Sequence, residues 1–131
     1  MTIPNRISAI SLFVDDVAAS KAFYADLFGV TPIFEDDVSA TFKFGETVVN
    51  LLRSDQANEI VAPGKVGAHD DGSRFQLTVW LDDADAIAAE LKRRGVAFTG
   101  PIDRPWGLRT LNFVDPSGHS WEVAHRLDRG R

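Results

Sequence analysis

Apolar residues recur with two different periods along this chain, and the alternation between the two periods predicts its elements. Residues 9–14 and 76–81 place a branched side chain at every second position, as in Ile10, Leu12 and Val14, which is typical of a strand with one buried face. A stretch with helical spacing follows each strand and ends at a glycine, Gly29 or Gly95. Three further extended segments follow each helix, at residues 30–35, 38–44 and 47–53, and at residues 96–99, 108–114 and 119–125.

This order of elements occurs twice, so the chain is predicted to contain an internal repeat. Residues 12–17, LFVDDV, match residues 79–84, VWLDDA, in position and in character. The two aspartates of each copy come directly before the helix, where a carboxylate accepts hydrogen bonds from the first turn and stabilises the positive end of the helix dipole. We therefore predict an α+β fold of two βαβββ modules, residues 7–53 and 74–126, within a single domain over residues 1–131. Because one such module leaves a sheet face uncovered, the two copies are expected to complete each other's core.

Residues 54–73 connect the two modules. This segment is polar and contains Gly64, Gly67 and Gly72. A connection of that length is uncommon inside a compact domain. We expect it to serve either as a lid or rim of a site or as a surface connector.

Composition and charge narrow the classes of function. The net charge is −5 and the basic residues are scattered, which argues against nucleic-acid binding because that function needs a stripe of Lys and Arg. The chain has no cysteine, which excludes disulfides, thiolate metal sites and cysteine nucleophiles and fits a reducing cytoplasm. It shows no basic segment followed by an apolar run at its start, and no stretch of the roughly 18 apolar residues that span a bilayer. We therefore expect a cytoplasmic protein without a membrane or nucleic-acid partner.

The alternation within each strand sorts the side chains into two faces. Branched and aromatic residues are expected to pack on the helices: Ile10, Leu12, Val14, Val49, Leu51, Leu77, Val79, Leu81, Trp121 and Val123. The opposite face then carries a mixture of polar and aromatic groups: Ser11, Phe13, Asn50, Gln76, Thr78, Trp80 and Glu122. Sealing Gln76 and Glu122 in a core would be costly, whereas aromatic walls with a few polar groups are typical of a ligand cavity. This pattern predicts a small-molecule site, and the alternative is that the aromatic side chains merely fill a concave sheet.

A third candidate aromatic, Trp106, lies between Pro105 and Gly107. Proline and glycine restrict the path of the loop at this point. Two roles stay open for Trp106, a flat surface for a ligand or a plug in the core.

Three motifs, in order, resemble the vicinal oxygen chelate superfamily, which includes glyoxalase I, extradiol dioxygenases, fosfomycin-modifying enzymes and bleomycin-resistance proteins. The motifs are the paired strand–Asp–Asp–helix signature, residues 23–29 (FYADLFG) and residues 115–122 (DPSGHSWE). The resemblance extends from about Ile7 to Arg126. It implies the glyoxalase/bleomycin-resistance fold, in which two βαβββ modules form a curved mixed sheet around a cavity.

Two segments are most similar to the bleomycin-resistance branch, residues 104–107 (RPWG) and residues 34–37 (FEDD). In that branch an arginine usually follows the Trp-Gly pair directly. Here Leu108 separates Gly107 from Arg109. Arg109 is therefore a ligand-binding candidate whose role stays open.

The resemblance also implies four metal-ligand positions, which correspond here to Ala9, Asn50, Gln76 and Glu122. Zinc and nickel sites draw on histidine and carboxylate donors, and hard cations draw on several carboxylates. Only Glu122 is charged, and an alanine has no donor atom. We therefore predict no metal and no cofactor, and expect these four positions to share a hollow that is too poor in donors to retain an ion.

The histidines are expected to be structural or to lie at the surface rather than to bind a metal. His69 falls in the connection, His119 falls at a turn, and His125 shares the alternation of Trp121, away from Glu122. Metal-dependent dioxygenase chemistry is disfavoured for the same reason.

The resemblance and the residues together favour a metal-independent binding protein that sequesters an aromatic or cationic ligand such as an antibiotic. Phe13, Trp80 and Trp106 would stack on the ligand and Glu122 would pair with a basic group. The alternative is a glyoxalase-like lyase or isomerase, possibly metal-free, in which Glu122 is the general base. A third option is a domain that only dimerises. The resemblance also implies a two-fold homodimer.

Overall fold

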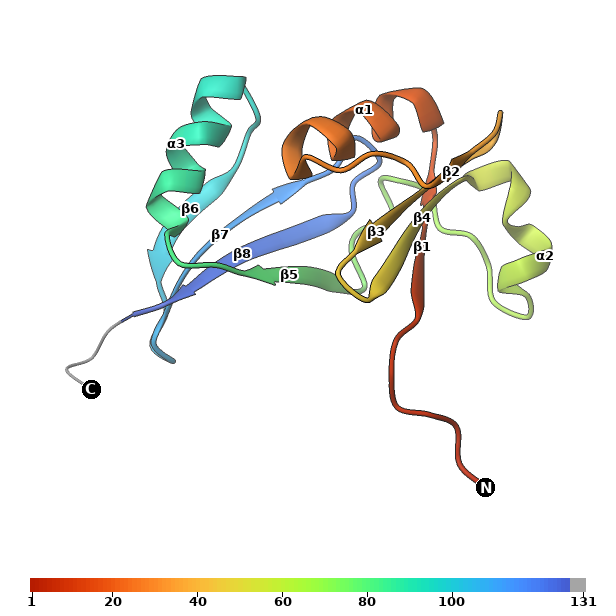
Figure 1. Ribbon diagram of the computed structural model, residues 1–131, viewed down its shortest axis with the longest axis horizontal. Helices are drawn as coiled ribbons and strands as arrows, with labels where there is room; N and C mark the ends of the chain where they lie inside the picture. Colours follow the sequence, from red (N-terminus) through yellow and green to blue (C-terminus); the bar gives the residue numbers. More distant parts are fainter. Residues whose placement is uncertain (128–131) are drawn as a thin grey trace. The chain divides into compact units, whose positions relative to one another are not determined.

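The computed structural model describes residues 1–127 and contains two compact units, Met1–Asp71 and Gly72–Arg131 (Figure 1). The first unit contains one main helix and four strands: β1 (Ala9–Val14), α1 (Val17–Phe28), β2 (Phe34–Glu35), β3 (Ser39–Phe44) and β4 (Thr47–Arg53). The second unit has the same order: β5 (Gln76–Trp80), α3 (Ala84–Arg94), β6 (Thr99–Asp103), β7 (Leu108–Val114) and β8 (Ser120–Arg126). The predicted α+β fold with two βαβββ modules is confirmed.

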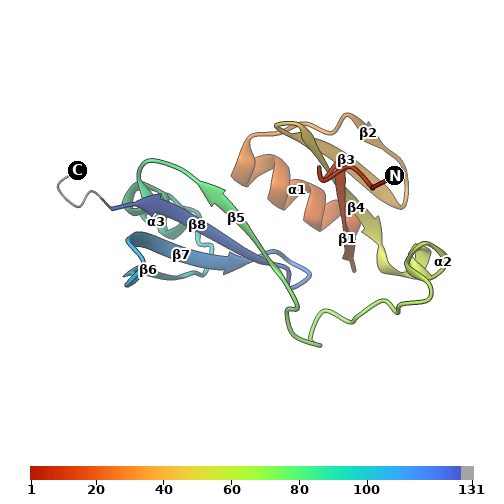
Figure 2. The same ribbon diagram turned by 90° about the horizontal axis from the view of Figure 1, so that it is seen from below.

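The two sheets have the same topology. Their strand orders are β1-β4-β3-β2 and β5-β8-β7-β6. The first strand of each unit pairs parallel with the last, and the other pairs are antiparallel. In each unit the main helix contacts the sheet on one face, α1 against β3 and β4 and α3 against β6, β7 and β8 (Figure 2). The other face of each sheet is therefore left for side chains that do not pack on the helix.

Both helices begin and end as the sequence predicts. The second aspartate of each pair is the N-cap, because Asp16 Oδ1 accepts a hydrogen bond from the Ala19 N–H and Asp83 Oδ1 accepts one from the Ala86 N–H, each at 3.0 Å. The helices end at Gly29 and Gly95, whose positive φ angles of 65° and 75° are ones that side chains disfavour. The repeated Asp-Asp motif thus has a local physical cause.

The buried apolar residues lie between helix and sheet in each unit. In the first unit they surround Tyr24, which is 0% exposed and has aromatic contacts with Phe28 and Phe42. Its counterpart in the second unit is Leu91, which is also buried. Six of the ten predicted helix-facing residues are buried: Leu12, Val14, Val49, Leu51, Trp121 and Val123. The other four are half-buried: Ile10, Leu77, Val79 and Leu81.

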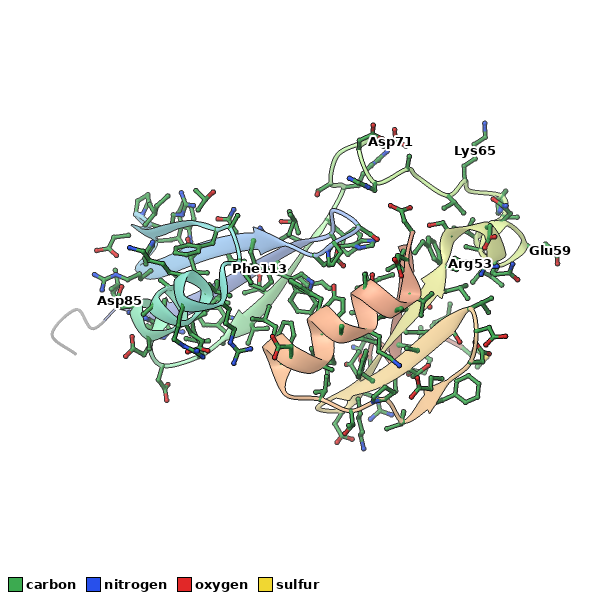
Figure 3. All side chains as sticks on the ribbon, turned by 90° about the horizontal axis from the view of Figure 1, so that it is seen from above. Arg53, Glu59, Lys65, Asp71, Asp85 and Phe113 are labelled. Carbon is green, nitrogen blue, oxygen red and sulfur yellow. The ribbon has the colours of Figure 1, made fainter. Side chains whose placement is uncertain are left out.

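Three elements differ from the sequence prediction. Strand β2 is limited to Phe34–Glu35, and the connection contains two short helices, η1 (Ser54–Gln56) and α2 (Asn58–Val61). Arg53, the last residue of β4, pairs with Asp55 of η1 (Figure 3). Strand β6 begins at Thr99 rather than ending there, and its register shifts between Thr99 and Ile102. A Cβ at Gly100 would lie 2.7 Å from the Thr110 carbonyl oxygen, so only glycine allows this close approach of the two strands.

Candidate functional site

The register of β1 and β4 defines the outward face of the first unit. Ser11 pairs with Asn50, and Phe13 pairs with Leu52. The Thr41 hydroxyl donates to Asn50 Oδ1 at 2.9 Å. Ser11 is exposed, while Phe13 and Asn50 are half-buried. This face therefore carries the predicted residues Ser11, Phe13 and Asn50 and no ionised group from either strand.

The register of β5 and β8 defines the outward face of the second unit in the same way. Thr78 pairs with Glu122, and its hydroxyl donates to Glu122 Oε1 at 2.9 Å. Gln76 Nε2 donates to Ser120 Oγ at 3.0 Å. These hydrogen bonds fix the orientation of a polar row in which Glu122 supplies a half-buried carboxylate. Four predicted site residues, Gln76, Thr78, Trp80 and Glu122, thus share one face of one unit.

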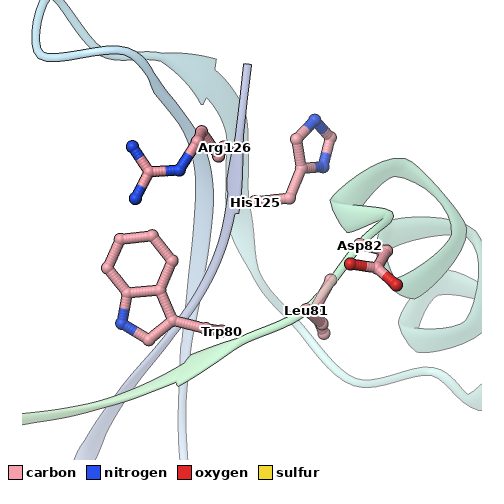
Figure 4. Close-up of a pocket in the computed structure, with 5 residues that line it drawn as sticks. All are labelled: Trp80, Leu81, Asp82, His125 and Arg126. Atoms are coloured by element: carbon pink, nitrogen blue, oxygen red, sulfur yellow. The ribbon is translucent and has the colours of Figure 1, made fainter. Parts of the chain in front are cut away.

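Trp80 continues this row at the end of β5, opposite the small side chain of Ala124. Its side chain is 58% exposed. Arg126, two residues beyond Ala124 on β8, places its guanidinium carbon 5.8 Å from the centre of the Trp80 ring system (Figure 4). Trp80 is therefore an exposed indole with a guanidinium against its ring system.

A pocket of about 310 Å³ opens beside this pair. Trp80, Leu81, Asp82, His125 and Arg126 line it. Figure 4 shows Trp80 and Arg126 on one side of β8, and His125 and Asp82 on the other. The pocket therefore presents an aromatic surface, one cationic side chain and one exposed carboxylate.

His125 is held in place by the helix that follows β5. The Ala84 N–H at the start of α3 donates to His125 Nδ1 at 2.7 Å. The proton of the neutral imidazole therefore belongs on Nε2. The other histidines contact carboxylates, His119 at 2.8 Å from Asp115 and His69 at 3.0 Å from Asp15.

Trp106 lies in the turn between β6 and β7 and is 66% exposed. The Gly107 N–H donates to the Arg104 carbonyl, and the Leu127 N–H donates to the Gly107 carbonyl. The turn is therefore attached to the end of β8 that carries Arg126. Of the two roles left open for Trp106, the plug in the core does not fit this exposure.

Arg109 lies on the helix side of its sheet, because it pairs with His125 in the register while Asn112 pairs with Glu122. Its guanidinium donates to both carboxylate oxygens of Asp103, at 2.6 and 3.1 Å, and to Asp85 at 2.8 Å. The hydrogen bonds that Arg109 donates to Asp103 and then to Asp85 raise the pKa of Arg109. Figure 3 shows Asp85 on α3. Arg109 thus ties the first turn of α3 to β6 and β7 and is not part of the outward face.

Comparison with known proteins assigns the class of this fold. The model of the Glyoxalase/Bleomycin resistance protein/Dioxygenase superfamily matches residues 6–123, so the chain belongs to this superfamily. None of the curated proteins matches the sequence. Within residues 1–127, no helix is long and apolar enough to cross a bilayer.

Several solved structures have the same fold. A glyoxalase/bleomycin resistance protein/dioxygenase from Nocardioides is 25% identical and matches 100% of this chain and 89% of its own, with a TM-score of 0.85. A lactoylglutathione lyase from Agrobacterium tumefaciens is 23% identical over 95% of this chain and 96% of its own, with a TM-score of 0.75. An antibiotic-binding protein from a Streptomyces species is 24% identical over 96% of this chain and 99% of its own, with a TM-score of 0.70. The last two likenesses show the fold alone.

The four positions at which metal-dependent relatives hold an ion do not fit one in this chain. In the first unit, Ala9 has no donor atom and Asn50 Oδ1 accepts the Thr41 hydroxyl. In the second unit, Gln76 is an amide and one oxygen of Glu122 accepts the Thr78 hydroxyl. One carboxylate and two amides lack the histidine and carboxylate donors that zinc, nickel or iron require.

Of the five residues that line the pocket, sequence reasoning predicted only Trp80 as a ligand contact and missed Leu81, Asp82, His125 and Arg126. Arg126 lies four positions after Glu122 along β8, so the alternation of the strand could have placed it on the same outward face. Asp82 was interpreted with Asp83 as a helix cap. In the structure the Ala86 N–H donates the cap hydrogen bond to Asp83.

Proposed function

We propose that this protein is a metal-independent binding protein that sequesters an aromatic or cationic small molecule, such as an antibiotic, on the outward face of β5 and β8. The observation that carries the proposal is the exposed indole of Trp80, which stands beside a pocket at the end of a polar strand row. Burying an exposed indole against a planar ligand is favourable, and aromatic stacking adds about 0.5–1.5 kcal/mol beyond the buried area.

The size and lining of the pocket favour a small planar compound. Its volume of about 310 Å³ is near the lower end of the roughly 300–1,000 Å³ that small-molecule sites occupy. Thr78 and Glu122 continue the same face, so a ligand that stacks on Trp80 can also reach a hydroxyl and a carboxylate. Phe13, Ser11, Asn50 and Trp106 stay predicted ligand contacts.

A binding screen tests this proposal directly. Purified protein is titrated with planar aromatic drugs and glycopeptide antibiotics, and the compound is recovered for analysis. We expect a rise in melting temperature and an unchanged compound. Because truncating a tryptophan anchor commonly costs about 2 kcal/mol or more, Trp80→Ala should lower affinity by about thirtyfold or more.

The matched control is Phe34→Ala, which removes another exposed aromatic, 56% exposed, from the first unit. It should leave ligand affinity and folding unchanged. The proposal fails if both variants weaken binding equally. It also fails if Trp80→Ala binds as well as the unmodified protein.

The alternative function is a glyoxalase-like lyase or isomerase with Glu122 as general base. The Thr78 hydroxyl donates to Glu122 Oε1 and so fixes the orientation of the carboxylate that would accept the proton. The test is product formation from the thiol adduct of an α-oxoaldehyde without added metal. Turnover that Glu122→Gln abolishes would favour the enzyme, and recovery of intact adduct would favour binding alone.

We also propose a two-fold homodimer in the cytoplasm, as the family resemblance implies. Light scattering after size exclusion should give roughly twice the 14.4 kDa of one chain. A mass equal to one chain would reject the dimer without affecting the ligand site on β5 and β8.

A further inference from the structure

Arg126 occupies the surface that a ligand needs in order to stack on Trp80. Its guanidinium carbon lies 5.8 Å from the centre of the Trp80 ring system, and both side chains line the same pocket. The register explains this contact, because Trp80 pairs with Ala124 and Arg126 is the next outward residue on β8. The small side chain of Ala124 leaves room for the guanidinium to reach across to the indole.

The contact has opposite consequences for ligands of opposite charge. A cationic aromatic must displace the guanidinium from the indole and then lie next to it, so it loses a cation–π contact and meets a like charge. An anionic aromatic must also displace the guanidinium from the indole, but its carboxylate can then pair with the displaced guanidinium, whose planar fork matches a carboxylate. The position of Arg126 thus opposes one class of ligand and supports the other.

Three further charged or titratable groups lie near the pocket, Asp82, Glu122 and His125. Asp82 lines the pocket and is exposed. Glu122 lies on the same face and, like Arg126, two residues from Ala124, the partner of Trp80; its Oε1 accepts the Thr78 hydroxyl. His125 is fixed by the backbone at the start of α3. Among the charged groups of residues 1–127, the one with a recorded contact to the Trp80 ring is Arg126.

We propose that Arg126 determines ligand specificity by charge, so that the site takes planar aromatic compounds with a carboxylate or similar anionic group in preference to cationic ones. This inference rests on the proposed binding function and narrows it, because it sets the cationic class aside. Arg126 acts on the ligand directly, by pairing with its anionic group beside Trp80.

Three probes of one shape test the inference: naphthoate, naphthylmethanol and naphthylmethylammonium. Isothermal titration calorimetry at low ionic strength should give the highest affinity for naphthoate and the lowest for the ammonium probe. One exposed ion pair is worth up to about 1 kcal/mol and a hydrogen bond to a charged group somewhat more, so Arg126→Gln should lower naphthoate affinity by about three- to tenfold. The same variant should leave the neutral probe within about twofold and bind the ammonium probe at least as tightly.

Three matched variants separate charge from packing. Arg126→Lys keeps the charge and loses the planar fork, so it should retain part of the preference for naphthoate. Asp82→Asn removes the opposite charge from the same pocket, so it should raise naphthoate affinity or leave it unchanged. Lys92→Ala removes an equal charge from the exposed end of α3, and it should change none of the affinities.

The outcomes distinguish this inference from the function on which it rests. Equal binding of naphthoate and naphthylmethanol by the unmodified protein overturns the inference and leaves the binding function standing. An equal loss for all three probes in Arg126→Gln also overturns it, because Arg126 would then act through packing alone. If none of the probes binds, or if Trp80→Ala binds all of them normally, the proposed function itself fails at this site.

Discussion

The outward faces of the two sheets differ in chemistry although their strands correspond one to one. In the first unit, Ser11 faces Asn50 and Phe13 faces Leu52. In the second unit, the corresponding pairs are Thr78 with Glu122 and Trp80 with Ala124. The helix-facing sides are alike, with buried branched residues in both units.

This difference shows which positions of the repeated fold require particular types of residue. The helix side must bury apolar area and the caps must satisfy backbone groups, so both copies keep the same types of residue there. The outward side bears no such requirement, and only the second copy places a carboxylate, an exposed indole and a guanidinium along it. This contrast supports the proposal that the main ligand contacts lie on the second unit.

The largest expected effect concerns the buried interior of each unit. Tyr24→Ala removes a buried ring from the first unit and should lower the free energy of unfolding by about 3–5 kcal/mol, since large-to-small core changes leave cavities. Leu91→Ala, at the corresponding position of the second unit, should cost about 2–5 kcal/mol. Urea denaturation measures both. A loss below about 1 kcal/mol in either variant would mean that the two interiors are not equivalent.

The helix caps provide a smaller and matched test. Asp16→Ala and Asp83→Ala should each cost about 1 kcal/mol, because each carboxylate accepts one backbone N–H at the same distance. The neighbouring variant Asp82→Ala should cost less, because the Ala86 N–H donates to Asp83. If Asp82→Ala costs more than Asp83→Ala, the equivalence of the two helix starts is wrong.

Arg109 tests the boundary between the two faces of the second sheet. Arg109→Ala breaks the contacts to Asp85 and Asp103 on the helix side, so it should lower the melting temperature slightly. It should leave ligand affinity unchanged, in contrast to Trp80→Ala. A loss of affinity without a loss of stability would return Arg109 to the ligand site and would contradict the two-face description.

The smallest expected effect concerns the charged residues in the last turn, which differ between the two helices. Helix α1 has no basic residue in its last turn, whereas α3 ends in Lys92, Arg93 and Arg94. Hydrogen bonds from Arg93 and then Arg94 lower the pKa of Glu90 to about 2 from its ordinary 4.5. The stabilisation of the folded state by ionised Glu90 with Arg93 and Arg94 is therefore fully present above about pH 4.5 and is lost as the pH falls through about 2. Carboxyl NMR should show the titration of Glu90, and Arg94→Ala should raise the pKa of Glu90. An unchanged pKa of Glu90 in that variant would contradict the assigned contact with Arg94.

Much of the fold followed from the sequence because local chemistry determines it. Period-two alternation sorted Leu12 from Phe13 and Val123 from Glu122, and the Asp-Asp and glycine signals located both helices. Strand β6 was misplaced because Gly100 and Pro101 are typical of a turn, whereas here the strand continues through them with a shift in register.

The site was predicted only in part. Trp80 and Glu122 stand out because an aromatic and a carboxylate are unusual neighbours on a strand face. Arg126 and Asp82 do not stand out, since exposed charged residues at the ends of elements are common on any surface. Their part in the pocket depends on the pairing of β5 with β8, which brings residues 80 and 126 together across 46 positions of sequence.

The most direct test of the central claim is an NMR titration with naphthoate that follows the indole Nε1–H signals. We expect the Trp80 indole signal to shift progressively until saturation, together with the backbone amide signals of Thr78 and Glu122. The indole signal of buried Trp121 should not shift. The claim is contradicted if the Trp80 signal stays fixed at saturation while the amides of Ser11 and Phe13 shift, because the ligand would then bind on the first unit.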